Sequence, residues 1–189
     1  MSKLAKQIKN IPKSYFSLND IKKISPLSEG GLKVAVSRMV KSGELINLAR
    51  GIYANDEARV DWEKLAVEYY IPSYLSFEWA LAKYNILSQQ PRQLALATAK
   101  RSKTAEIGEK TITYHHLKKE LFWGYKKINS ALCAEPEKAF LDLAYLSLNG
   151  YAKFDPEEMN INLLNKNKLK KYLKKFDNKK LERLIKPII

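Results

Sequence analysis

The stretch from residue 17 to residue 55 constrains the fold of this chain more than any other. It contains a short helix-forming segment, a turn, a second helix-forming segment and then two short β-forming runs around Arg50-Gly51. This order is typical of a winged helix-turn-helix, in which the second helix enters the major groove of DNA and a hairpin flanks it. All four base pairs can be distinguished in that groove. The order of elements therefore predicts a DNA-binding domain over residues 1–55.

Capping residues indicate where these helices begin and end. Ser17 precedes apolar residues at helical spacing, and Asp20 follows three positions later, which approximates a capping box. A proline ends this helix, and Ser28 is placed to cap the next one, which should continue to about Ser42. An earlier helix is predicted over residues 3–10.

The helix that follows Ser28 has two separate faces. At about 100° per residue, its apolar side chains fall on the side that should pack on the preceding helices: Leu32, Ala35, Val36, Met39 and Val40. The other side carries Gly30, Lys33, Val34, Ser37, Arg38 and Lys41. Arginine binds guanine through two hydrogen bonds, serine suits several bases, and an apolar side chain suits the thymine methyl group. The expected DNA-binding residues are therefore Ser28, Lys33, Val34, Ser37, Arg38 and Lys41.

The two β-forming runs predict a small hairpin after this helix. Residues 45–48 and 52–53 are rich in β-forming side chains, and Gly51 can adopt the positive φ that a tight turn requires. Arg50 at the tip would reach a phosphate or the minor groove. Two alternatives remain open at this point: an ordinary amphipathic surface helix, or a winged helix that binds protein instead of DNA.

Positive charge is concentrated at the two ends of the chain. The net charge is +14; residues 1–55 contribute +7, residues 56–150 only +1, and residues 151–189 +6. A basic excess of this size favours a polyanionic partner through counterion release. For the C-terminal segment we favour amphipathic helices whose lysines are solvated, and extra phosphate contact is the alternative.

Composition excludes several classes of protein. Hydrophobic residues make up 46% of the 189 residues, which is enough for real cores. No apolar run approaches the roughly 20 residues of a membrane span, and the N-terminus lacks the apolar region of a signal peptide. Cys133 is the only cysteine, which excludes an intramolecular disulfide and a cysteine-based zinc cluster. The expected location is the cytoplasm, without a membrane partner.

The remainder of the chain predicts a second domain of mixed α and β structure. Residues 56–61 are polar and form the expected linker, so that the second domain covers residues 62–189. Helices are expected at residues 62–69 and 77–84, from Pro136 to about Ser147, and in a C-terminal tail whose helix starts at Asp155. Strand-like runs are expected at residues 93–99, 111–117 and 128–133, with a turn at Gly108. The predicted fold class is α+β, with an N-terminal winged helix-turn-helix, a mixed α/β domain and a helical tail.

Residues that invite a catalytic or metal-site interpretation are few. His115 and His116 are adjacent, so on a strand they point to opposite faces and do not share a metal easily. Glu137 and Asp142 diverge by about 140° on a helix; Glu135 and Glu137 fit charges near a helix N-terminus better. No phosphate-binding loop or nucleophile motif is present. We therefore expect no enzyme, no catalytic residues, no metal and no cofactor.

A second basic run lies in the otherwise near-neutral middle of the chain. Lys100, Arg101 and Lys103 surround Ser102 at a strand end or turn. A surface loop of this composition can bind phosphate or an acidic partner. The alternative is a turn whose charges serve only to keep the protein in solution. Lys100, Arg101 and Lys103 are therefore a possible second basic contact.

Four segments, in order along the chain, resemble the AbiEi family of antitoxins and transcriptional regulators from type IV toxin–antitoxin systems. They are SRMVKSGELINLARGIYA, IPSYLSFEWALAKYNIL, ALATAKRSKTAEIGEKTITYHHL and ALCAEPEKAFLDLAYL, at residues 37–54, 71–87, 95–117 and 131–146. The resemblance implies a bacterial regulator of abortive infection, a form of phage defence. Such a regulator represses its own operon and counters an adjacent nucleotidyltransferase-like toxin.

The resulting prediction is a DNA-binding autorepressor and antitoxin. Its expected partners are double-stranded operator DNA, arranged as repeated half-sites, and a cognate toxin. Two alternatives are a nuclease or nucleotidyltransferase that a winged helix targets to DNA, and a module that binds RNA or protein. The enzyme alternative lacks a convincing set of carboxylates or metal ligands in the sequence.

Overall fold

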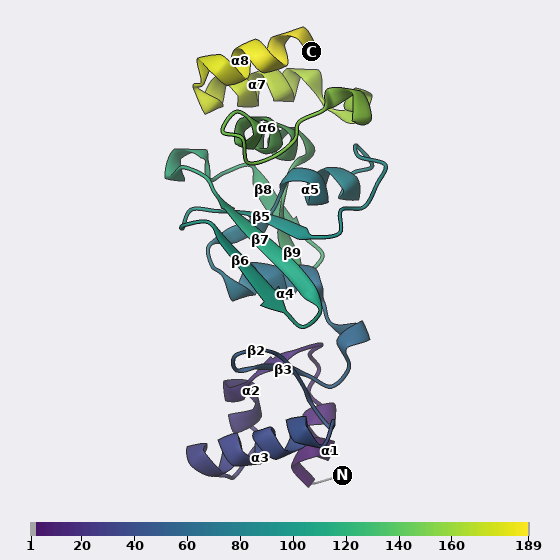
Figure 1. Cartoon of the computed structure of the whole chain (residues 1–189), viewed down its shortest axis with the longest axis vertical. Coiled ribbons are helices and arrows are strands. Elements are labelled where there is room, and N and C mark those ends of the chain that lie inside the picture. Colours follow the sequence, from purple (N-terminus) through teal and green to yellow (C-terminus); the bar gives the residue numbers. More distant parts are fainter. Residues whose placement is uncertain (1–2, 189) are drawn as a thin grey trace. The chain divides into compact units, whose positions relative to one another are not determined.

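The computed structural model describes residues 3–188 and shows an α+β protein (Figure 1). The chain divides into two compact units. The first comprises the residues up to Leu65 together with Glu106–Lys110, and the second comprises Ala66–Ala105 and the residues from Thr111 onward. Each unit has its own sheet of hydrogen-bonded strands, and the two are described separately below.

The part of the first unit within residues 3–54 contains three α-helices and a small sheet. The elements are α1 (Lys3–Lys9), β1 (Phe16–Ser17), α2 (Leu18–Lys22), α3 (Glu29–Lys41), β2 (Ile46–Ala49) and β3 (Ile52–Ala54). The strands are antiparallel in the order β1-β3-β2. The three predicted helices and the predicted hairpin are confirmed, whereas β1 was not predicted because a two-residue strand has no periodicity of its own.

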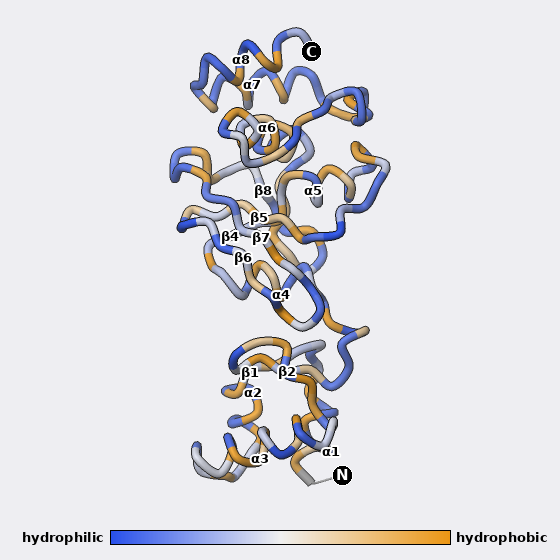
Figure 2. The backbone as a smooth tube through the Cα atoms, in the orientation of Figure 1, coloured by the Kyte–Doolittle hydropathy of each residue, from blue (hydrophilic) through white to orange (hydrophobic). Residues whose placement is uncertain are grey.

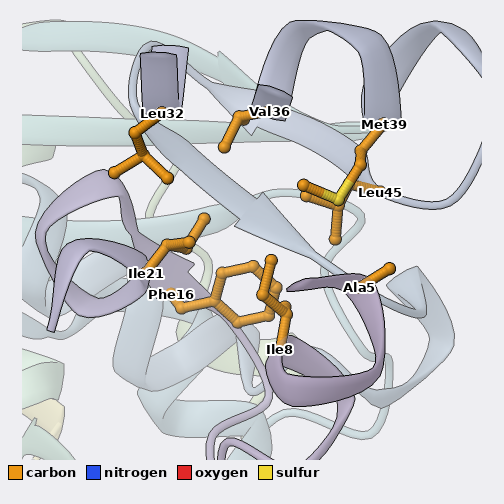
Figure 3. Close-up of a cluster of buried hydrophobic side chains, with 8 residues drawn as sticks. All are labelled: Ala5, Ile8, Phe16, Ile21, Leu32, Val36, Met39 and Leu45. Atoms are coloured by element: carbon orange, nitrogen blue, oxygen red, sulfur yellow. The ribbon is translucent and has the colours of Figure 1, made fainter. Parts of the chain in front are cut away.

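One cluster of buried apolar side chains holds the first unit together (Figure 3). Leu32, Val36 and Met39 of α3 point into it and are at most 5% exposed. They pack with residues from α1, β1, α2 and the segment before β2: Ala5, Ile8, Phe16, Ile21 and Leu45. These three α3 residues lie three or four positions apart, so their burial fixes how the helix is rotated about its own axis.

The predicted linker at residues 56–61 carries local structure and belongs to the first unit. Its middle forms a 3₁₀ turn, Glu57–Arg59, capped by the side chain of Asp56. The backbone N–H of Asp61 donates to Ser14 Oγ at 3.0 Å. The boundary between the units therefore falls inside α4 (Trp62–Tyr69) and not in an extended polar segment.

The second unit is built on a mixed sheet. Within the described residues, its strands run in the order β6-β7-β5-β4-β9-β8. Pairs β5·β7 and β4·β9 are parallel, while β4·β5 and β8·β9 are antiparallel. The strands are β4 (Ser73–Leu75), β5 (Leu94–Thr98), β6 (Lys103–Ile107), β7 (Lys110–His116), β8 (Tyr125–Ile128) and β9 (Ala131–Ala134).

Helix α6 (Pro136–Ser147) is the central helix of this unit, as its apolar sequence predicts. Phe140, Leu141 and Leu143 are fully buried. α5 (Phe77–Lys83), α7 (Lys166–Phe176) and α8 (Lys179–Ile185) pack against it. Figure 2 shows hydrophilic and hydrophobic residues alternating along α7 and α8, as expected for helices with one apolar face.

Two local predictions for the second unit were wrong. The single run expected at residues 128–133 is a hairpin of β8 and β9, and Asn129 adopts a positive φ of 53° between them. Asp155 does not start a long helix, because it caps only the 3₁₀ turn Pro156–Glu158. The α-helix of the tail begins later, where Asn165 accepts a hydrogen bond from the backbone of Lys168.

Candidate nucleic-acid interface

Side-chain caps fix the starts of α2 and α3, the two helices on either side of the predicted turn. At α2, Ser17 Oγ accepts from the Asp20 N–H at 3.2 Å, and Asp20 Oδ2 accepts from the Ser17 N–H at 2.9 Å, so the predicted capping box is present. Lys13 Nζ also donates to Asp20 at 2.7 Å. Burial alone would raise the pKa of Asp20, but the hydrogen bonds from Lys13 and Ser17 lower it to about 2. The carboxylate therefore stays charged and fixes the start of α2.

Ser28 caps α3 as predicted, since its Oγ accepts from the Gly31 N–H at 3.3 Å. This bond uses the hydroxyl as an acceptor and leaves its O–H free to donate. Ser28 was also predicted to contact DNA, and its exposed position at the first turn is compatible with both roles.

The outward face of α3 presents the predicted residues together. Lys33, Ser37, Arg38 and Lys41 are exposed, and Val34 has 51% of its surface exposed although it is apolar. The burial of Leu32, Val36 and Met39 on the opposite side accounts for this arrangement. The face therefore combines two ammonium groups, a guanidinium, a hydroxyl and one apolar contact on one rigid helix.

Lys33 differs from the other cations because it has a partner on its own helix. Its Nζ lies 2.8 Å from Glu29 Oε1, one turn earlier, and both side chains are well exposed. The hydrogen bond from Lys33 lowers the pKa of Glu29. Exposed pairs of this kind contribute little to stability. A phosphate could therefore replace Glu29 as the partner of Lys33 at small cost.

Arg50 lies at the tight turn between β2 and β3, as predicted, and is exposed. Gly51 beside it has a φ of 76°, which a residue with a side chain rarely adopts. The Gly51 carbonyl accepts from the Leu18 N–H at 3.1 Å. This bond ties the hairpin turn to the start of α2 and so fixes the backbone on which Arg50 stands.

A buried ionic cluster in the second unit was not predicted from the sequence. Lys138 and Asp142 of α6 are an ion pair one turn apart, and both are 0% exposed. Asp142 also accepts from Tyr74 Oη at 3.0 Å and from Ser76 Oγ at 2.8 Å. Burial lowers the pKa of Lys138 and raises that of Asp142, because both lose water. Both charged groups are closed to solvent, and each has its partner inside the unit.

Glu135 and Glu137 lie at the N-terminus of α6, as predicted, and they also hold α7. Lys168 Nζ lies 3.0 Å from Glu135 Oε1 and 3.3 Å from Glu137 Oε2. Glu137 Oε1 also accepts from the backbone N–H of Asn165 at 2.9 Å, and Tyr172 Oη donates to Glu135. Lys168 and Tyr172 lie four positions apart on α7 and so share one side of the helix, which is the sequence signal for these contacts.

The two adjacent histidines have different surroundings, as the strand geometry predicts. His115 packs edge-on against the ring of Phe77, and burial lowers its pKa. His116 is exposed. Within residues 3–188 no group of three or more His, Cys, Asp or Glu side chains is arranged to hold a metal ion.

The second basic run is exposed at the turn from β5 to β6. Lys100 and Arg101 lie in the turn, and Lys103 is the first residue of β6. These residues belong to the second unit, whereas the α3 face belongs to the first. The structure therefore has two separate candidate sites for polyanions.

Comparisons of the whole sequence do not assign either site. No model of a known protein family matches the chain, and a comparison with functionally curated proteins finds no match either. Within the described residues no helix is both long and apolar enough to cross a bilayer.

Proposed function

We propose that the first unit is a winged helix-turn-helix that binds double-stranded DNA, with α3 in the major groove. The observation that carries this proposal is the composition of the outward face of α3. Three cations, a serine hydroxyl and an exposed valine lie together on a helix whose rotation the core determines. Exposed valine is unfavourable in water but suits a thymine methyl group.

The proposed roles differ along this face. Arg38 reads a base edge, since a guanidinium can bind guanine through two parallel hydrogen bonds. Lys41 and Arg50 bind phosphates, which position the protein without reading sequence. Val34 and Ser37 contribute apolar contact and a hydrogen bond to base edges.

We further propose that the protein represses its own operon and acts as the antitoxin of a type IV toxin–antitoxin system. The resemblance of four segments to the AbiEi family supports this part of the proposal. Operator DNA with repeated half-sites and a cognate nucleotidyltransferase-like toxin are the corresponding partners.

A promoter–reporter fusion tests the proposal in cells. The DNA upstream of the reading frame drives the reporter, and the protein is supplied from a separate plasmid. We expect wild-type protein to repress and Arg38→Ala/Lys41→Ala to lose repression. Lys6→Ala/Lys9→Ala is the matched control, because it removes the same charge from exposed positions on α1. Equal loss of repression in both double variants would show that only net charge matters and would contradict the assigned interface.

A further inference from the structure

The basic turn of the second unit is held rigidly by side chains from outside it. Tyr70 Oη donates to the carbonyl of Arg101 at 3.2 Å, and His116 Nδ1 lies 2.8 Å from the carbonyl of Lys100. The backbone N–H of His116 donates to Ser102 Oγ at 2.9 Å. The carbonyls that would repel an anion are therefore occupied.

The two lysines of this turn are placed over aromatic rings and not beside carboxylates. Lys103 Nζ lies 4.7 Å from the ring centre of Tyr69 and 5.2 Å from that of Tyr70. Lys100 Nζ lies 5.2 Å from the ring centre of Tyr70. Across residues 3–188, no ion pair involves Lys100, Arg101 or Lys103. Their charge is therefore available to an anionic ligand.

Two hollows flank the turn and share Ser102 and His116. One, of about 660 Å³, is lined by Lys100, Arg101 and Tyr70 among others. The second, of about 630 Å³, extends from Lys103 past Lys118 to the end of α6, where Tyr145 and Tyr151 form part of its wall. No aspartate or glutamate is among the described residues that line either hollow.

The second hollow has an aromatic surface that is open to a ligand. Tyr151 is 71% exposed, although aromatic side chains are usually covered. Its backbone N–H donates to the Leu146 carbonyl at 3.3 Å, which ties the residue to the end of α6. An exposed ring beside free cations is the combination with which proteins bind unpaired nucleotides: bases stack on the ring, and phosphates meet the cations.

We propose that these two hollows bind a single-stranded segment of nucleic acid. The phosphates lie along Lys100, Arg101 and Lys118, and an unpaired base enters the second hollow and stacks on Tyr151. A base inside a duplex is already stacked on its neighbours and cannot enter such a hollow. The site lies in a different unit from α3 and does not depend on the proposed binding of duplex DNA.

Fluorescence anisotropy with the full-length protein tests this site. The probes are labelled oligouridylate and oligothymidylate of about eight nucleotides, a common site size, and a duplex of the same length. Three variants are compared with the wild type. Lys100→Ala/Arg101→Ala/Lys118→Ala removes the cations, and Tyr151→Ala removes the stacking ring. Lys170→Ala/Lys171→Ala/Lys174→Ala removes the same charge from exposed positions on α7 and is the matched control.

We expect the first triple variant to bind the single-stranded probes at least about tenfold more weakly, because it loses phosphate contacts. Tyr151→Ala should weaken them by at least about fivefold, the loss expected for one stacked base. The α7 control should change affinity by less than about twofold, because none of its residues lines either hollow and salt screens exposed charges that do not contact the ligand. Binding of both probes would show that the sugar is not recognised, and binding of oligouridylate alone would identify RNA as the ligand.

Three results would overturn the proposal. The first is an equal loss for the α7 control, which would reduce the effect to net charge. The second is unchanged affinity of Tyr151→Ala, which would remove the stacked base. The third is displacement of the labelled single strands by an unlabelled duplex as effectively as by an unlabelled single strand. All substituted residues are exposed, and a thermal melt of each variant confirms that it is folded.

Discussion

In the proposed interface, Arg38 is assigned to a base edge and Lys41 to a phosphate, and single substitutions separate these two roles. Both are exposed on α3 and lie three positions apart, which is close to one helical turn. Neither has a carboxylate partner among the described ion pairs. Arg38→Ala should cost about 1–3 kcal/mol on operator DNA and relax the preference at one position. Lys41→Ala should weaken binding evenly across sequences. A competition assay with operators mutated at each position measures both effects, and identical losses on specific and random DNA for both variants would exclude base recognition by Arg38.

Lys138 and Asp142 give a prediction for stability at the same scale. Lys138→Met leaves the Asp142 carboxylate buried without its cation and should cost about 3–5 kcal/mol. The double variant Lys138→Met/Asp142→Leu should lose less, since no unpaired charge remains. The deficit of the single variant should shrink as the pH falls, because the buried carboxyl group takes up a proton. Urea denaturation at neutral and acidic pH measures this, and a double variant less stable than the single one would contradict it.

The sequence shows why some of these residues were predictable and others were not. The exposed face of α3 follows from helical periodicity, since every apolar residue except Val34 falls on one side. Lys138 and Asp142 have the spacing of an ordinary exposed i,i+4 pair. Their burial depends on Tyr74 and Ser76, more than 60 positions away in the chain, and local patterns carry no information about such distant partners.

At the scale of elements, α2 depends on its capping box. The pKa of Asp20 is about 2 in the folded protein, below its ordinary value of 3.8. A lowered acid pKa means that its contribution is complete above the ordinary value and is lost as the pH falls toward 2. Asp20→Asn should cost the first unit about 1 kcal/mol at neutral pH. It should also flatten the loss of stability between about pH 4 and pH 2, as acid titration of unfolding would show; acid-unfolding curves that run parallel for variant and wild type would contradict this account.

Whether an element could be predicted depended on an apolar stripe, a cap or a turn signal in its own segment. The helices with an apolar stripe or a cap were found from periodicity, including α3, α4 and α6. The strands β1 and β4 have two and three residues and show no pattern of their own. Asp155 and Pro156 form a sound helix start, yet only a 3₁₀ turn follows, because no apolar stripe continues after them.

For the whole molecule, the basic face of α3 and the basic turn at Lys100–Lys103 have different expected consequences. The α3 face is a rigid surface suited to a duplex, whereas the turn at Lys100–Lys103 in the second unit borders hollows suited to unpaired nucleotides. Among the lysines of α7, Lys168 pairs with Glu135 and Glu137, and Lys175 lies over the ring of Trp123. The exposed lysines Lys170, Lys171 and Lys174 fit the interpretation of a solvated helix face. The two sites should therefore respond to different substitutions and to different forms of nucleic acid.

The measurement that tests the central claim most directly is binding of the purified protein to the DNA upstream of its reading frame. A scrambled duplex serves as the comparison, and both are titrated over a range of salt concentrations. We expect a strong preference for the upstream DNA and a steep fall in affinity with salt, both reduced in Arg38→Ala/Lys41→Ala, because phosphate contacts release counterions. Equal and weak binding to the two duplexes, unchanged in that variant, would contradict the assignment of α3 as a DNA-binding helix.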